Sequence, residues 1–137
     1  MIAAPSLFER IPKPAHPREL NPDYLMSYSS TGCSETWELS NMGSERSVQA
    51  GRKVVSNNGD FLYALTMAGD GICVLPDFIS SKGLKDGEVV PILPDWKIPS
   101  LWLTLYYPPY EKLPPIVGTF AEYFEAFVRA HPNLQSR

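Results

Sequence analysis

The side chains that could carry catalysis or bind a metal ion are few and lie far apart in the sequence. His16 and His131 stand near opposite ends of the chain, and neither has a second ligand at helix or loop spacing. Asp60, Asp70 and Asp77 are candidate acids, but each also fits a simpler role in a helix first turn or a tight turn. The sequence has no nucleophile elbow, phosphate loop or four-donor zinc pattern. We therefore predict a protein that is not an enzyme and has no metal and no cofactor.

Three junctions have instead the composition of a ligand-binding edge. Each follows a predicted strand, and in open α/β sheets ligands bind outside the carboxyl ends of the strands. Hydroxyl and amide groups close to free helix N–H groups suit a small polar or anionic ligand. The same residues also form helix caps and turns, so both interpretations stay open at this point. The junctions are Ser29, Ser30 and Thr31; Asn57, Asn58 and Gly59; and Pro76, Asp77 and Phe78.

The spacing of apolar residues predicts an α/β fold with a largely parallel core sheet, because predicted strands alternate with helices along the chain. Residues 60–68 and 115–130 carry apolar side chains at three- and four-residue spacings, which is typical of amphipathic helices. Residues 41–44 read Asn-Met-Gly-Ser and predict a hairpin turn between the alternating runs 35–40 and 46–56. Further strands are expected at residues 24–28, 72–75, 88–93 and 101–107, and a second helix is expected to open at residue 76.

Length, charge and cysteine content exclude several classes of protein. A chain of 137 residues holds one domain with a real core but hardly two. Its net charge of -3 and its scattered basic residues give no electrostatic footprint for DNA or an anionic membrane. Two distant cysteines do not make a disulfide framework, and the N-terminus lacks the features of a secretion signal. We therefore expect a cytoplasmic protein that contacts neither nucleic acid nor membrane directly.

The order of several segments resembles the effector-binding domain of LysR-type transcriptional regulators. The segments are VVSNNGDFLYALTMAGDGICVLPDFI, then GEVVPILPDW, LWLTLYYPP and LPPIVGTFAEYF, preceded by IAAPSLFERIPKPAHPRELNPDYLMSY. Trp37 stands where many members of the family have a tryptophan. No single motif is decisive, but the series covers nearly the whole chain in family order and with family-like spacing.

The resemblance implies a periplasmic-binding-protein-like subdomain, with a mixed sheet flanked by helices, inside an incomplete two-subdomain effector domain. Residues 3–94 would form the second subdomain, and residues 95–137 would supply the crossover strand and C-terminal helix of the first. The winged helix-turn-helix that binds DNA in such regulators has no counterpart here. The opening half of the first subdomain is also expected to be missing, whether by engineering or by a truncated reading frame.

The resemblance also implies a site and partners. A small-molecule effector would bind in a cleft between the subdomains, contacting Ser29, Ser30, Thr31, Asn57, Asn58 and Gly59, with Pro76 and Phe78 as an apolar wall. A homo-oligomer is expected, with Phe120, Phe124 and Phe127 of the C-terminal helix as contact residues. Any contact with DNA would be made by the absent N-terminal domain. The identity of the effector is not readable from these junctions.

Two other functions remain open beside effector sensing in transcription regulation. One is a truncated interaction or dimerisation fragment that pairs with itself or with full-length regulators. The other is a stand-alone solute-binding module without DNA-binding activity, against which the lack of an export signal counts.

Overall fold

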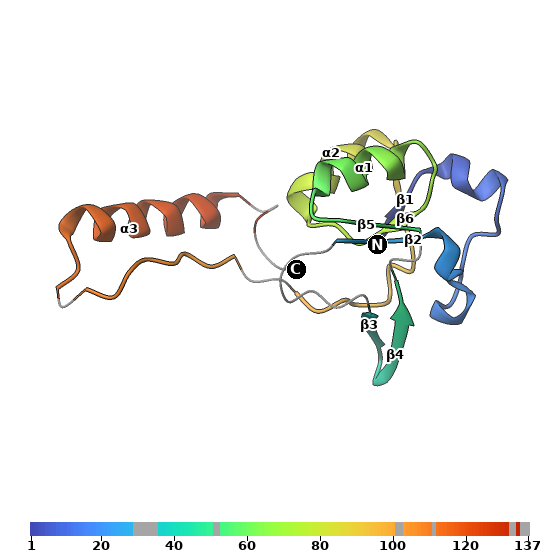
Figure 1. Ribbon diagram of the computed structural model, residues 1–137, viewed down its shortest axis with the longest axis horizontal. Coiled ribbons are helices and arrows are strands. Elements are labelled where there is room, and N and C mark those ends of the chain that lie inside the picture. Colours follow the sequence, from blue (N-terminus) through green and yellow to red (C-terminus); the bar gives the residue numbers. More distant parts are fainter. Residues whose placement is uncertain (29–35, 51–52, 101–102, 111, 132–133, 135–137) are drawn as a thin grey trace. The chain divides into compact units, whose positions relative to one another are not determined.

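The computed structural model describes residues 1–28, 36–50, 53–100, 103–110, 112–131 and 134. It contains two compact units, Met1–Pro99 and Ser100–Arg137, and each is described by itself. The first unit holds both sheets and all of the described buried residues, and the second holds one long helix (Figure 1).

A five-stranded mixed sheet forms the centre of the first unit, with the strand order β5-β2-β6-β1-β7. Strand β2 pairs in parallel with both β5 and β6, whereas β1 pairs antiparallel with both β6 and β7. The prediction of a largely parallel sheet is therefore right for three neighbouring strands and wrong for the other edge. The strands are β1 (Ile2–Ala3), β2 (Leu25–Tyr28), β5 (Val54–Ser56), β6 (Ile72–Cys73) and β7 (Val90–Pro91).

A separate hairpin joins β3 (Thr36–Asn41) to β4 (Ser44–Gln49) in the register expected for a two-residue turn. Met42 and Gly43 have φ values of 45° and 80°, and the tight hairpin turn needs positive φ at both positions. The single strand predicted over residues 46–56 is instead two strands: β4 ends at Gln49, and β5 begins at Val54 and belongs to the other sheet, while residues 51 and 52 lie outside the described residues. The edge of β3 that does not face β4 forms an antiparallel bridge with Lys97, which exchanges two backbone hydrogen bonds with Ser40.

Helices begin and end where local signals place them. Helix α1 (Gly59–Met67) starts at Asn58, whose side-chain oxygen accepts a hydrogen bond from the N–H of Phe61 at 3.1 Å. Helix α2 (Asp77–Asp86) begins one residue after the predicted start at residue 76 and ends at Gly87, whose φ is 75°. Three 3-10 turns with proline at the first position precede β2: η1 (Pro5–Glu9), η2 (Pro17–Glu19) and η3 (Pro22–Tyr24).

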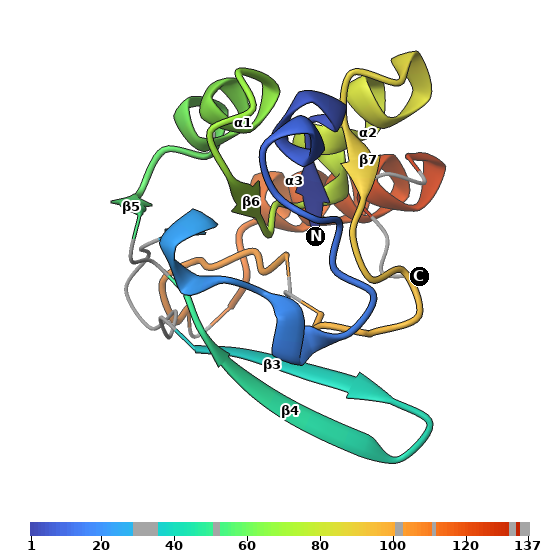
Figure 2. The ribbon, with the colours of Figure 1, turned by 90° about the vertical axis from the view of Figure 1, so that its right-hand side faces the viewer.

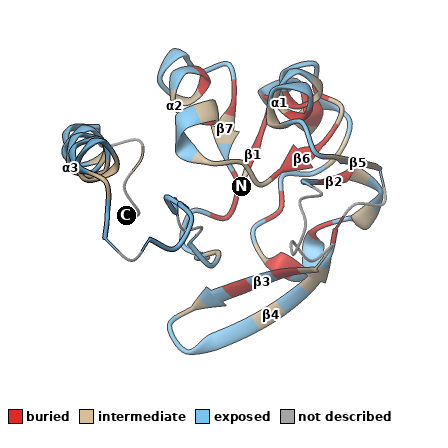
Figure 3. Cartoon of the chain, turned by 60° about the vertical axis from the view of Figure 1, so that its left-hand side comes forward, coloured by how far each residue is buried: buried red, intermediate tan, exposed pale blue. Residues whose placement is uncertain are grey.

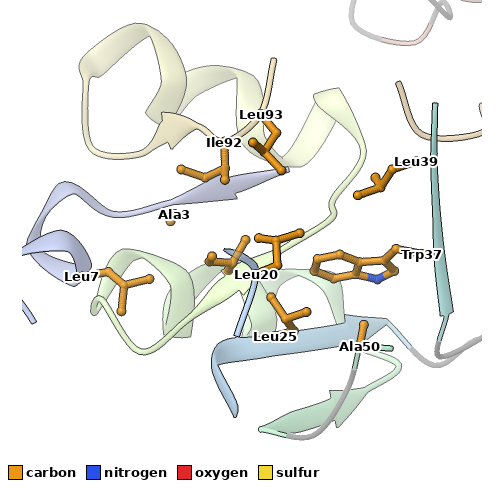
Figure 4. Close-up of a cluster of buried hydrophobic side chains, with 10 residues drawn as sticks. Ala3, Leu7, Leu20, Leu25, Trp37, Leu39, Ala50, Ile92 and Leu93 are labelled. Carbon is orange, nitrogen blue, oxygen red and sulfur yellow. The ribbon is translucent and has the colours of Figure 1, made fainter. Parts of the chain in front are cut away.

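The sheet separates two apolar clusters, as successive side chains on a strand point to opposite faces. Leu25 and Ile72 lie on the face of the sheet that the hairpin covers. There they form an apolar cluster with Trp37 and Leu39 of the hairpin and with buried residues in and next to η1 and β7 (Figure 4). Their neighbours in sequence, Met26 and Cys73, pack instead with Leu62 of α1. Figure 2 shows α1 and α2 on one side of the sheet and the hairpin on the other. The first unit is thus built in three layers.

The buried thiol of Cys73 makes stability sensitive to alkaline pH. Burial raises the pKa of this thiol to about 12. In the unfolded chain the thiol ionises at about 9, so the unfolded state loses a proton first and stability falls as pH rises from about 9 towards 12. Between pH 8 and pH 10 we expect Cys73 to contribute a loss of about 1.4 kcal/mol in the free energy of unfolding. Urea titrations of the wild type and Cys73→Ala measure it, and equal slopes against pH in both proteins would contradict it.

The second unit contains α3 (Pro115–Ala130) and an extended segment at residues 103–110. The helix matches its prediction. Within the part described, residues 103–110 pair with no strand, so the strand predicted at 101–107 does not form there; residues 101 and 102 lie outside the described residues. A strand needs a partner for its backbone groups, and sequence periodicity cannot supply one. Among the described residues, no helix is long and apolar enough to cross a membrane.

Candidate functional site

The carboxyl ends of three parallel strands meet at one edge of the sheet in the first unit. Residue pairing aligns Tyr28 at the end of β2 with Ser56 at the end of β5, and β2 also runs parallel to β6. Helix α1 follows β5 after two residues and α2 follows β6 after three. Both helices therefore begin at this edge, with their positive dipole ends and unpaired N–H groups directed to it.

The corner before α1 combines a helix cap with an unused amide. The N–H of Asn58 donates to Ser56 Oγ at 3.1 Å, and Asn58 Oδ1 caps the N–H of Phe61. The Asn57 side chain is exposed, and no described residue hydrogen-bonds to it. Of the two asparagines that the sequence singles out, Asn58 is committed to the cap and Asn57 is available to a ligand.

An apolar wall stands beside Gly59. A Cβ at this position would lie 2.6 Å from Ile79 Cδ1 and 3.9 Å from both Leu75 Cδ2 and the Tyr28 ring. These contacts bring the end of β2, the start of α1 and the first turn of α2 together. The sequence does not single out Tyr28, Leu75 or Ile79 as site residues. The only signal for them is that each is adjacent to a predicted junction.

The corner before α2 is apolar and more open. Pro76 is half-buried, and its carbonyl accepts hydrogen bonds from the N–H groups of Ile79 and Ser80 and from the Ser80 hydroxyl. Phe78 is 58% exposed. Phe78 is not among the three side chains nearest to a Cβ at Gly59, and its place in an apolar wall stays a prediction. Ser29, Ser30 and Thr31 lie outside the described residues, and their role as ligand contacts also stays a prediction.

The charge at this edge is balanced locally. Asp60 and Asp77 each lie in the first turn of a helix, where a carboxylate offsets the positive end of the dipole. The described residues contain no group of three or more His, Cys, Asp or Glu side chains that could hold a metal ion. Hydrogen bonding and apolar contact are thus the interactions that this edge offers to a ligand.

Two surface hollows lie away from these residues. One, of about 760 Å³, lies between the hairpin turn and residues 94–97, and it is lined by Ser40, Asn41, Asp95 and Lys97 among others. The other, of about 330 Å³, lies within the second unit. Neither contains a predicted effector contact. Both hollows are open to solvent, and the first is lined mainly by residues of turns. The strand-end edge is therefore the better candidate for the ligand site.

The predicted oligomerisation residues lie on α3. Helix α3 has only exposed and half-buried residues (Figure 3). Phe120 and Phe127 are exposed and Phe124 is half-buried, with its ring centre 6.1 Å from that of Phe120. Their role as contact residues stays a prediction.

Comparison with known proteins assigns this α/β domain to a class of regulatory, effector-binding domains. Residues 1–129 match the family model of the LysR substrate binding domain. The chain belongs to this family and is a non-enzymatic domain of the LysR-type regulators.

Curated relatives are regulators that are much longer than this chain. The regulator PtxR of Pseudomonas aeruginosa is 26% identical over 121 residues, which are 88% of this chain and 39% of PtxR. An uncharacterised HTH-type transcriptional regulator of Haemophilus influenzae is 31% identical over 112 residues, 82% of this chain and 39% of its own length. The chain thus spans about two fifths of the length of these relatives.

Solved structures agree on the fold. The regulatory domain of AphB from Vibrio vulnificus, treated with cumene hydroperoxide, superposes with a TM-score of 0.66 at 25% identity. The match covers 91% of this chain and 62% of that domain. Another structure of the same regulatory domain gives a TM-score of 0.62 at 24% identity. The α/β fold with a mixed sheet is that of a LysR-type regulatory domain.

Proposed function

We propose that this chain is the effector-sensing part of a LysR-type transcriptional regulator and that it binds a small polar or anionic molecule at the strand-end edge. The observation that carries the proposal is the convergence of three strand ends and two helix starts on Asn57 and Gly59. This edge offers a free side-chain amide, unpaired N–H groups and an apolar wall, which is the mixture that small-molecule sites use.

Sensing would work by a shift in population. A ligand that bridges this edge and a second, facing surface would favour a closed form in proportion to its preference for that form. Closure would then change how protomers dock in a homo-oligomer and so space the DNA-binding segments of the assembled regulator. Such a regulator would work in the cytoplasm, and its DNA contacts would be made outside these residues.

The test is the thermal stability of the chain in the presence of small carboxylates, amino acids and sugars. A molecule that binds the folded state at a hundred times its Kd should stabilise it by about 2.7 kcal/mol, which raises the Tm. Asn57→Ala should abolish most of this rise, because it removes the free amide. It should change the Tm of the ligand-free chain little, because the residue is exposed and makes no hydrogen bond to a described residue.

Two further variants separate binding from folding. Gln49→Ala removes an exposed amide from the hairpin and should leave the ligand-induced rise intact. Asn58→Asp keeps an oxygen at the cap of α1 and should preserve the helix. A ligand whose stabilising effect is the same in Asn57→Ala and in the wild type would place the site elsewhere.

A further inference from the structure

Strand β4 has an outer edge, six residues long, with which no described strand pairs. Its inner edge pairs with β3 in an unbroken register of six residue pairs, so β4 has no bulge. Soluble proteins usually block an open edge with proline, lysine, a bulge or a very short strand. The edge strands of the five-stranded sheet follow this rule, since β5 has three residues and β7 has two, one of them Pro91. Strand β4 has neither proline nor lysine, and most of it is exposed (Figure 3).

The pairing of β3 with its two neighbours fixes which backbone groups of β4 point to the outer edge. In an antiparallel pair, opposite residues alternate between pairs that exchange hydrogen bonds and pairs that do not. Ser40 uses its N–H and its C=O on Lys97, so Ser40 and Glu45 form a pair of the second kind. The backbone groups of Glu45, and of Ser47 and Gln49 at the same alternation, therefore point away from β3.

Five of these six backbone groups have no hydrogen-bond partner among the described residues. The exception is the Glu45 carbonyl, which accepts a bond from Arg46 Nη1 at 2.7 Å. A carbonyl oxygen has two lone pairs, so this one can accept a second bond from another strand. The outer edge of β4 is thus a template for strand addition, in which main-chain hydrogen bonds supply affinity and alternate side chains supply specificity.

The side chains next to this edge favour a basic partner. Glu38 and Glu45 are exposed on the face of the hairpin opposite Trp37, and among the described residues neither carboxylate forms an ion pair. Both carboxylate oxygens of Glu38 accept a hydrogen bond from Ser47 Oγ, at 2.7 and 2.8 Å, which holds the charge over β4. A strand added to β4 places alternate side chains opposite Glu45 and Ser47, where Lys or Arg would meet both carboxylates.

The other face of β4 offers apolar contact, and the charges disfavour a second copy of β4. Val48 is half-buried on the core side of the hairpin, so a β-branched residue between the two bases would cover it. Two copies of β4 paired about Ser47 would instead gather Glu38 and Glu45 of each copy, four carboxylates, on one face. Like charges close together on one face of a sheet destabilise it.

We propose that the outer edge of β4 binds an extended segment of a partner protein as an added strand, with Lys or Arg at alternate positions of that segment. The bases pair with Glu45 and Glu38, and the backbone of the segment completes the hydrogen bonds of Glu45, Ser47 and Gln49. The effector site lies on the other sheet, so either proposal can fail without the other.

Fluorescence polarisation of two labelled peptides with the full chain tests strand addition. The first is the heptapeptide Thr-Lys-Val-Lys-Val-Lys-Thr, which should bind saturably with a Kd below about 1 mM. The second has the same sequence with N-methyl groups on its three lysines. It keeps every charge but loses the N–H groups that face β4, and should bind at least about tenfold more weakly.

Variants of the chain locate the contact. Ser47→Pro removes an N–H that points to the outer edge and leaves the ladder with β3 intact, so it should weaken binding at least about tenfold. Ser47→Ala is its matched control, because it keeps the N–H, and should change binding less than about threefold. Glu38→Gln/Glu45→Gln should weaken binding about fivefold and reduce its dependence on salt. Circular dichroism and the Tm establish that each variant is folded.

Equal binding of the two peptides, or equal binding of the first peptide to the wild type and Ser47→Pro, would mean that charge alone holds it and would overturn the proposal. The absence of saturable binding would overturn it as well. Sedimentation velocity covers the remaining occupant: self-association of the wild type that is lost in Ser47→Pro but kept in Ser47→Ala would make a second copy the partner of this edge and reject a basic segment.

Discussion

Replacing Trp37 by alanine is expected to destabilise the first unit by about 3–5 kcal/mol, the usual cost of deleting a buried tryptophan. The side chain is only 7% exposed although it stands on a two-stranded hairpin. Its indole points from β3 towards Leu20 and Leu25 in the layer beneath the sheet (Figure 4). An isolated hairpin of two strands is marginally stable in water, so this contact and Leu39 hold the hairpin in place.

Urea unfolding followed by circular dichroism measures the loss, and hydrogen exchange shows where it acts. The amides of β3 and β4 should exchange faster than those of β2 and β6, because the hairpin is released before the sheet opens. Phe78→Ala is the matched control, since this aromatic side chain is 58% exposed and should cost less than about 1 kcal/mol. Equal losses in the two variants would show that Trp37 does not anchor the hairpin.

Features with a local cause could be predicted from the sequence. The hairpin turn follows from Asn41 to Ser44, the start of α1 from Asn58 and its end from Gly69, which has a φ of 77°. Helix α3 follows from its apolar spacing alone. In each case the residues that specify the element are its own, so no knowledge of the rest of the chain is needed.

Features that depend on pairing could not be predicted in the same way. Strand β1 is two residues long and exists because Ile2 lies between Cys73 and Pro91 in the sheet. The separation of β4 from β5 likewise depends on pairing, because β4 pairs with β3 and β5 pairs with β2. The candidate site shows the same division: Asn57 and Gly59 are recognisable as a strand-end junction, whereas Leu75 and Ile79 become part of it only when α2 packs beside α1.

Gly83→Ala is expected to destabilise the first unit by about 2 kcal/mol, although alanine is the better helix former by up to about 1 kcal/mol. Gly83 lies buried in α2, and a Cβ there would stand 1.9 Å from the hydroxyl oxygen of Tyr63 on α1. That hydroxyl is buried and, among the described residues, has no hydrogen-bond partner of good geometry. At this helix separation an added Cβ would force the Tyr63 ring or one of the helices to shift.

Tyr63, the residue that the added Cβ would meet, gives the decisive control. Tyr63→Phe removes the oxygen, after which the nearest ring atom, Cζ, lies 3.1 Å from the added Cβ. That contact is relieved by a shift of a few tenths of an ångström, so in the Tyr63→Phe background Gly83→Ala should be neutral or stabilising. Tyr63→Phe alone should cost little, since the hydroxyl that it removes makes no hydrogen bond of good geometry. Urea unfolding of the four proteins gives the coupling energy, expected to be about 2 kcal/mol. If Gly83→Ala costs the same in both backgrounds, the cause lies in the backbone of α2 and not in its contact with α1.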